Sequence, residues 1–73
     1  MPRLPLLSGR KIIYALEKIG YRPVRQRGSH IGLFCEGKQS VTAPNYDLVG
    51  RGLMRKILRD AVLSPSEFME LLK

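Results

Sequence analysis

The sequence predicts a small α+β protein in which helices cover one face of a three-stranded antiparallel sheet. Two observations carry this prediction. Segments whose apolar residues recur at helical spacing lie at both ends of the chain, and three short extended segments lie between them. The turns between the extended segments are too short for the crossovers that parallel strands require. Because a sheet with one apolar face must be covered on that face, the flanking segments are expected to pack there as helices.

The first helix is predicted over residues 9–19. Ser8 precedes it as an N-cap, because a serine hydroxyl can accept a hydrogen bond from a free backbone N–H of the first turn. Gly20 follows it, at the position where a left-handed residue commonly closes a helix. The apolar residues between these two ends form one stripe: Ile12, Ile13, Leu16 and Ile19.

Three strands and two turns are predicted next, as an antiparallel meander. The strands are expected over residues 22–26, 30–35 and 39–43, and the turns over residues 27–29 and 36–38. Pro23 donates no ladder hydrogen bond, so the first strand is expected at an edge of the sheet. The second strand then occupies the centre.

The central strand carries two sets of side chains, because successive residues of a strand point to opposite faces. The set expected to face the helices, together with Val41 of the third strand, is Ile31, Leu33 and Cys35. The set expected on the open face is His30, Gly32 and Phe34.

A linker is expected over residues 45–52, before the second helix. The apolar stripe that predicts this helix is Leu53, Met54, Ile57, Leu58 and Ala61. A short final helix is predicted to start at Ser64, because Pro65 and Glu67 follow it in the pattern of a capping box. The order α-β-β-β-α, plus the short C-terminal helix, is that of a small double-stranded-RNA-binding-domain-like fold.

The length and charge of the chain bound its class. Seventy-three residues allow one domain, residues 1–73, and exclude an enzyme with a separate cofactor domain. Thirteen Lys and Arg against six Asp and Glu give a net charge of +7, which favours a polyanionic partner such as nucleic acid.

Membrane and metal-dependent classes are not expected. No apolar run approaches the ~20 residues that span a bilayer, and the first seven residues, broken by Pro5, are too short for a signal peptide. Cys35 has no partner for a disulfide, and one Cys with one His is too few for a zinc site. We therefore expect a reducing, cytoplasmic compartment, no membrane, no metal and no cofactor.

His30 is the candidate general base, because histidine is the side chain that ordinarily titrates near neutral pH. Arg25 and Arg27 precede it closely, and Lys38 lies on the neighbouring turn. A base beside cations can cleave RNA: the base removes the ribose 2′-hydroxyl proton, and the cations stabilise charge on the phosphorane. Since RNA supplies this nucleophile itself, no metal is required. A lone histidine is more often a surface or structural residue, and that interpretation stays open here.

Several other residues are candidates for RNA contacts. These candidates are Arg25, Arg27, Gly28, Ser29, Lys38, Tyr46, Arg51 and Arg55. Lys56 and Arg59 would extend the same basic face. Such charge runs are more often a solvated surface, yet an excess of seven positive charges favours a face that tracks phosphates. Gly28 is expected to adopt a positive φ, and Ser29 to shape the turn or contact a phosphate. Tyr46 either stacks on a base or caps the sheet.

Six segments of the chain resemble segments of a known protein family. They cover residues 4–9, 16–21, 25–30, 41–45, 52–58 and 63–68. They cover nearly the whole chain, and they recur in the same order in HicA-like proteins. This family comprises the toxins of the HicAB toxin–antitoxin modules of bacteria and archaea. The resemblance is specific where Arg27-Gly28-Ser29-His30 is combined with the Gly-Leu-x-x-x-Ile-Leu pattern of residues 52–58, and either segment alone would be weak.

The resemblance to HicA implies an RNA-binding-domain-like fold and a ribosome-independent ribonuclease that cleaves mRNA. The catalytic histidine of the family is the one after Gly-Ser, which corresponds to His30, and the glycine of the same motif corresponds to Gly28. The resemblance also implies a HicB-type antitoxin that covers the active site. We expect the free toxin to be a monomer, oligomeric within the complex, and the antitoxin to present acidic groups to the His30 face.

Two positions depart from the family pattern. The family often has a second histidine directly after the first, where this chain has Ile31, and commonly a histidine after the Pro-Asn pair, where this chain has Tyr46. If the second histidine assists cleavage in relatives, this chain acts with one imidazole or acts weakly.

Two other functions compete with that of a ribonuclease. The first is a binding module that sequesters RNA without cutting it, through Tyr46 and the basic residues. The second is an accessory protein whose basic face recruits an acidic partner, and it predicts no salt-dependent binding of RNA by the free protein.

Overall fold

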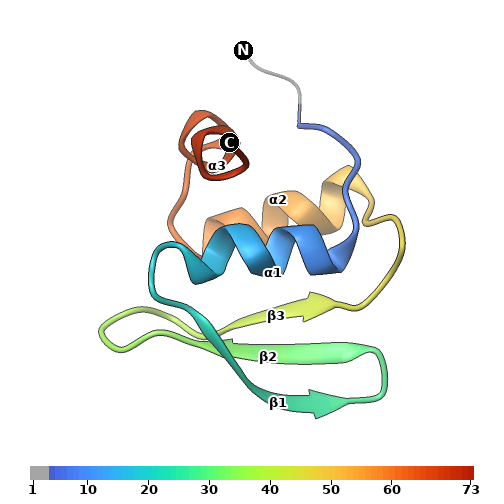
Figure 1. Cartoon of the computed structure of the whole chain (residues 1–73), viewed down its shortest axis with the longest axis vertical. Coiled ribbons are helices and arrows are strands. Elements are labelled where there is room, and N and C mark those ends of the chain that lie inside the picture. The colour runs from blue at the N-terminus through green and yellow to red at the C-terminus, as the bar shows by residue number, and fades with distance from the viewer. Residues whose placement is uncertain (1–3) are drawn as a thin grey trace.

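The computed structural model describes residues 4–73 and has the predicted α+β order (Figure 1). Residues 1–3, which begin the stretch considered above as a signal peptide, lie outside the described residues. The elements are α1 (Gly9–Glu17), β1 (Arg22–Arg27), β2 (His30–Phe34), β3 (Val41–Pro44), α2 (Arg51–Asp60) and α3 (Pro65–Leu71). Within residues 4–73, no helix has the length and apolarity needed to cross a membrane.

The sheet is antiparallel in the order β1-β2-β3, so β1 lies at an edge and β2 in the centre, as predicted. The register between β1 and β2 shifts at Val24, which has no partner between the pairs of Pro23 and Arg25. This bulge reverses the alternation of β1. The resulting pairs are Arg22 with Phe34, Arg25 with Gly32, and Arg27 with His30. The three arginines thus share one face with His30 and Phe34, called the open face below.

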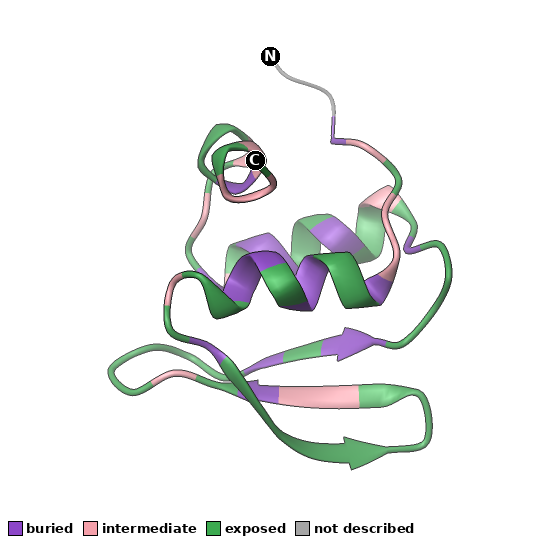
Figure 2. Cartoon of the chain, viewed as in Figure 1, coloured by how far each residue is buried: buried purple, intermediate pink, exposed green. Residues whose placement is uncertain are grey.

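The core lies between the sheet and the helices. Both α1 and α2 contact β3, and α3 contacts α1 on the side away from the sheet (Figure 1). Figure 2 shows buried residues on the facing sides of α1, α2 and β3, whereas β1 is exposed along its whole length. The inward residues Leu33, Val41 and Ala43 are buried, and Ile31 and Cys35 are half-buried against the core, which confirms the predicted alternation.

The helix α1 has both predicted ends. The Ser8 hydroxyl accepts a hydrogen bond from the Lys11 N–H at 3.2 Å. At the other end Gly20 has φ +105°, its N–H donates to the Glu17 carbonyl, and the Tyr21 N–H donates to the Leu16 carbonyl. These paired bonds form a Schellman motif. The regular helix ends at Glu17 rather than at residue 19, because residues 18 and 19 already bond to carbonyls three residues back.

Other boundaries differ from the predicted ones by one or two residues. The strand β1 extends to Arg27, β2 ends at Phe34, and β3 covers residues 41–44 instead of 39–43. The helix α2 begins at Arg51, inside the expected linker, and Leu53 is 38% exposed instead of joining the buried stripe. The predicted capping box of α3 is present: the Ser64 N–H donates to the Glu67 carboxylate at 2.8 Å, and the Glu67 N–H donates to the Ser64 hydroxyl at 3.1 Å. These bonds hold the Glu67 pKa below its usual value.

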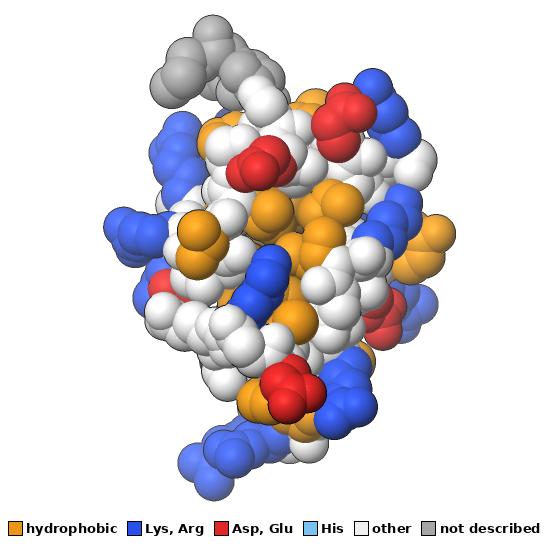
Figure 3. Space-filling model, turned by 90° about the vertical axis from the view of Figure 1, so that its left-hand side faces the viewer, with side chains coloured by type: hydrophobic (Ala, Val, Ile, Leu, Met, Phe, Trp, Pro, Cys, Tyr) orange, Lys and Arg blue, Asp and Glu red, His pale blue; other side chains and the backbone are white. Residues whose placement is uncertain are grey.

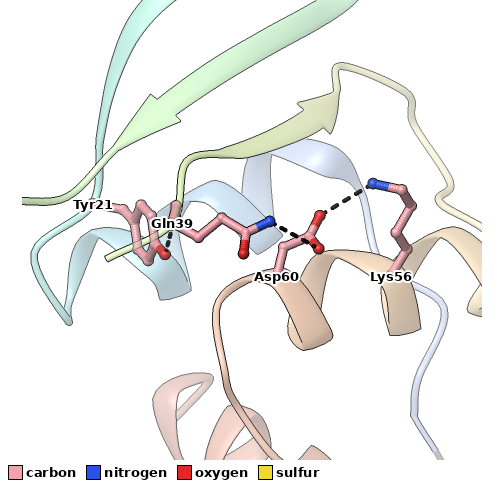
Figure 4. A network of polar contacts seen from close by, with 4 residues as sticks. All are labelled: Tyr21, Gln39, Lys56 and Asp60. Atoms are coloured by element: carbon pink, nitrogen blue, oxygen red, sulfur yellow. Dashed lines mark hydrogen bonds and ion pairs between the residues drawn. The ribbon is translucent and has the colours of Figure 1, made fainter. Parts of the chain in front are cut away.

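A short polar network explains why Gln39 lies outside β3 (Figure 4). The Tyr21 hydroxyl donates to the Gln39 backbone carbonyl at 2.7 Å, so this carbonyl is bonded to a side chain instead of a strand. The Gln39 amide contacts Asp60 at 3.5 Å, and Asp60 pairs with Lys56 at 3.1 Å. The network joins the end of α1 to the β2–β3 turn and α2. Burial of the ring, with smaller contributions from Cys35 and Asp60, raises the pKa of Tyr21.

Gly9 marks the closest approach between α1 and the sheet. A Cβ atom at this position would overlap the backbone carbonyl oxygen of Pro44. The Gly9 N–H donates to the carbonyl of Tyr46 at 2.9 Å, so the first turn of α1 lies directly against the segment that follows β3. Only glycine permits this contact without a shift of the backbone.

Val62 closes α2 in an unfavourable backbone conformation. It has φ +57°, a region that a β-branched residue rarely adopts. The Leu63 N–H donates to the Leu58 carbonyl and the Val62 N–H to the Arg59 carbonyl, which is again a Schellman motif. The side chain of Val62 is 80% exposed, so burial of that side chain offsets little of the strain.

The substitution Gly9→Ala is expected to destabilise the protein, against helix propensity. Propensity alone favours alanine in a helix by up to about 1 kcal/mol, but the overlap with Pro44 should outweigh it and lower the free energy of unfolding by roughly 1–3 kcal/mol. Gly52→Ala in α2 is the matched control, because a Cβ there meets no atom within 4 Å. The control should be neutral or stabilising in urea titrations. A stabilised Gly9→Ala protein would contradict the contact.

The substitution Val62→Gly is expected to raise the free energy of unfolding by about 1 kcal/mol, because glycine removes the Cβ strain of the left-handed conformation. Val62→Ala keeps a Cβ and removes the same exposed methyl groups, so it should change stability much less. Thermal unfolding of the three proteins measures the difference. Equal stabilities of the Gly and Ala variants would show that Val62 is unstrained.

Candidate nucleic-acid interface

His30 is held by backbone pairing on both sides. It is the first residue of β2, and its register partners are Arg27 in β1 and Pro44 in β3. Beyond the end of β3, the Asn45 N–H donates to the Ser29 carbonyl at 2.6 Å, which continues the pairing by one residue. The side chain itself is exposed on the open face. The backbone of His30 is therefore fixed while its imidazole remains accessible to a ligand.

The turn before His30 has the predicted conformation. Gly28 has φ +59°, and a Cβ at this position would meet nothing within 4 Å, so glycine is favoured here by conformation rather than by lack of space. The Gln26 side-chain amide donates to the Gly28 carbonyl at 3.1 Å across the turn. Ser29 is exposed beside His30, and its carbonyl is the acceptor for Asn45.

A shallow hollow of about 310 Å³ lies on the open face next to His30. Its lining includes Arg25, Arg27, His30, Gly32 and Thr42. A Cβ on Gly32 would lie 3.6 Å from the Cβ of Arg25, so a larger side chain at residue 32 would fill the space that the hollow now occupies. The bulge at Val24 thus brings two guanidinium groups and one imidazole to the walls of a single concavity.

Tyr46 lies beside His30. The centres of the two rings are 6.5 Å apart, with an angle of 70° between their planes, an edge-to-face arrangement. Tyr46 is 45% exposed, so part of its surface is accessible to a ligand. Its position follows from its backbone, because the Tyr46 carbonyl accepts the hydrogen bond from Gly9 at the start of α1.

The predicted basic residues do not form one continuous face. Lys38 lies in the turn between β2 and β3, whereas His30 lies at the other end of that hairpin, so the expectation that Lys38 is close to His30 is wrong. Its ammonium group lies 6.0 Å from the centre of the Tyr21 ring. The other predicted cations, Arg51, Arg55, Lys56 and Arg59, belong to α2 in the helical layer. The Arg51 Nε donates to the Leu4 carbonyl at 2.8 Å, and Arg55 is exposed.

The open face is positively charged without compensation from the strands. No Asp or Glu occurs in β1, β2 or β3. Within residues 4–73, ion pairs form only between Lys56 and Asp60, at 3.1 Å, and between Lys73 and Glu70, at 2.9 Å. Arg25 and Arg27 thus have no carboxylate partner in the described part of the chain. Figure 3 shows Lys and Arg side chains at the lower end of the molecule, where β1 lies in Figure 1, and along both sides of the view.

The arrangement around His30 combines a proton acceptor, two cations and an exposed aromatic ring on one accessible surface. Such a set can bind a phosphate and transfer a proton beside it. The sequence did not reveal Val24 as the residue that aligns the cations, because a bulge has no signature in a segment this short. Over residues 4–73, no group of three His, Cys, Asp or Glu side chains lies close enough together to hold a metal ion.

Comparison with known proteins identifies one family. The family model described as the HicA toxin of bacterial toxin–antitoxin systems matches residues 9–63. The matched stretch runs from the start of α1 past the end of α2 and contains the whole sheet, His30 and Tyr46. No curated protein matches the chain.

Proposed function

The chain belongs to the HicA toxin family and is the toxin component of a toxin–antitoxin system, and from this premise we propose that it is an endoribonuclease that stops translation by cutting mRNA. The observation that carries the proposal is the position of His30. This imidazole is exposed on a fixed backbone, in a hollow shared with Arg25 and Arg27, on a face whose strands contain no acidic residue.

In the proposed reaction His30 is the general base. Its imidazole takes the proton of a ribose 2′-hydroxyl, and the 2′ oxygen attacks the adjacent phosphorus. The bond from phosphorus to the 5′ oxygen breaks, and this oxygen takes up a proton from water. The protonated His30 then gives its proton to the hydroxide that remains, which restores the base. The products are a 2′,3′-cyclic phosphate and a 5′-hydroxyl end. The nucleophile comes from the RNA itself, so the route is independent of metal ions, and DNA, which lacks the hydroxyl, is not cut.

The neighbouring residues support this chemistry by binding the substrate. Arg25 and Arg27 stabilise the negative charge that builds on the phosphorane, since a cation beside the developing charge lowers the barrier. The exposed turn of Gly28 and Ser29 contacts the backbone of the same strand, and Tyr46 contacts the nucleotide next to the scissile phosphate. Lys38, Arg51 and Arg55 lie on other parts of the molecule, and in this proposal they contact RNA that extends beyond the open face.

The antitoxin partner is proposed to be of the HicB type and to cover the open face with acidic groups. The face favours such a partner because its arginines have no carboxylate of their own in the described residues. The proposed site of action is the cytoplasm, where mRNA is translated. We propose one domain over residues 1–73, which is monomeric when free and oligomeric within the complex.

A second candidate function is RNA binding without cleavage. Tyr46 favours it, because an exposed ring next to His30 can bind a nucleotide without any proton transfer. The two functions differ in their dependence on His30, since binding through Tyr46 and the arginines should survive loss of the imidazole.

Replacement of His30 by alanine is expected to abolish both growth arrest and mRNA fragmentation when the protein is induced in cells. The measurement is growth together with mRNA integrity on a gel, for the wild type, His30→Ala and His30→Gln. Thermal unfolding of the purified variants is the control, and no loss of fold is expected because the side chain is exposed. Growth arrest with intact mRNA in every variant would rule out the ribonuclease.

Removal of the open-face cations is expected to reduce the salt dependence of RNA binding. In a non-cleaving His30→Ala background, Arg25→Gln and Arg27→Gln should each lower the slope of log affinity against log salt by about 0.7, the value for one phosphate contact to a single strand. Lys11→Gln, which removes the same charge from α1, should leave the slope unchanged. Fluorescence anisotropy over a KCl series measures the slopes, and equal slopes in all variants would place RNA elsewhere.

A further inference from the structure

Phe34 is a large apolar residue on the same face of β2 as His30. Its side chain is 39% exposed, although the strand residue before it, Leu33, is almost fully buried. The alternation of the strand accounts for this, because Phe34 lies four residues from His30 and therefore points to the same side. The exposed part of the Phe34 ring does not contribute to the core. Nothing in the cleavage reaction proposed above uses it either.

The surroundings of Phe34 are those of a second concavity. A hollow of about 270 Å³ lies beside it and is lined by Gly20, Arg22, Phe34, Cys35 and Glu36. Arg22 is the register partner of Phe34 across β1 and β2. One guanidinium group and one aromatic ring thus lie together at the far end of the open face. Glu36 is the one acidic residue in this lining, and it belongs to the turn after β2.

On the open face of β2, no side chain of that strand lies between His30 and Phe34. Gly32, the residue between His30 and Phe34 on the open face, has no side chain. At ~3.4 Å per residue, four strand residues separate the two positions by ~14 Å. This distance is about four times the ~3.4 Å rise between stacked nucleotides, so a base at Phe34 belongs to a different nucleotide from the phosphate at His30.

We infer that Phe34 and Arg22 form a base-binding subsite, in which Phe34 stacks on an unpaired base of the same RNA strand whose phosphate lies at His30. The inference rests on the proposed function and adds to it the form of the substrate, an extended single strand along β2. Every base has a flat face that can stack on a phenyl ring, whereas the bases of a duplex are already stacked on one another. Arg22 contributes a cation for the adjoining phosphate, because it lies on the same face of β1 as Arg25 and Arg27.

The test is binding of a fluorescein-labelled, mixed-sequence single-stranded oligoribonucleotide to proteins that also carry His30→Ala, so that no cleavage occurs. Phe34→Ala should weaken binding roughly 5- to 100-fold, as alanine substitution of stacking residues generally does. Phe34→Leu keeps the apolar bulk without the ring and should also lose affinity, whereas Phe34→Tyr should retain it. Tyr14→Ala, which removes an exposed aromatic residue from α1, is the control and should bind as the parent does.

The outcomes separate this inference from the proposed function. If the parent binds the oligonucleotide and Phe34→Leu binds it equally well, the subsite is overturned while RNA binding stands. If the parent does not bind, both fail. The same RNA annealed into a duplex should bind more weakly and independently of residue 34, and duplex binding equal to that of the single strand would overturn the inference. A Phe34→Leu protein that loses only its complex with the co-expressed antitoxin would assign the ring to a protein contact and overturn it too.

Discussion

The burial of one face of the sheet is the constraint on which the rest of this molecule depends. A chain of 73 residues buries a limited share of its surface, and its buried apolar residues are concentrated between the sheet and the helices. Tyr21, which precedes β1, and Phe68 of α3 are the largest fully buried side chains among the described residues. The opposite face is exposed to water, so the cations on it remain hydrated. The candidate site therefore lies on the face of the sheet that does not contribute to the core.

The candidate site is nevertheless connected to the core through the backbone. Gly9 lets the first turn of α1 touch the carbonyl of Pro44, and its N–H holds Tyr46. Asn45, between them, bonds to Ser29 beside His30. Pro44, Asn45 and Tyr46, at the end of β3 and just after it, thus connect the first helix, the central strand and the turn before His30. A residue of this surface can be exposed and still have a fixed position, which is what a site on an open surface requires to orient a ligand.

The periodicity of the apolar residues predicted most of the fold. The features that it did not predict depend on pairing between residues that are distant in the sequence. The stripe from Ile12 to Leu16, the closing glycine at residue 20 and the alternation around Leu33 are local patterns, and the structure confirms each of them. Lys38 was expected near His30 because the two lie in neighbouring segments, but the hairpin places them at opposite ends. The left-handed Val62 has no local signature, since valine ordinarily avoids that conformation, and the unpaired Val24 has none either. For the candidate site, the sequence identified His30 and the arginines that flank it as candidates. It did not show on which face of the sheet those arginines lie.

The bulge at Val24 has a consequence for how this protein can vary through evolution. Substitutions in β1 change one side chain each, and the strand is exposed along its whole length, so many of them leave the fold intact. A deletion or insertion between Pro23 and Arg25 changes the parity of every residue after it, and turns Arg25 and Arg27 to the other face. Lineages of this chain should therefore tolerate sequence divergence in the strand while conserving its length, because one residue more or less turns Arg25 and Arg27 away from the open face and leaves only Arg22 of the three arginines there.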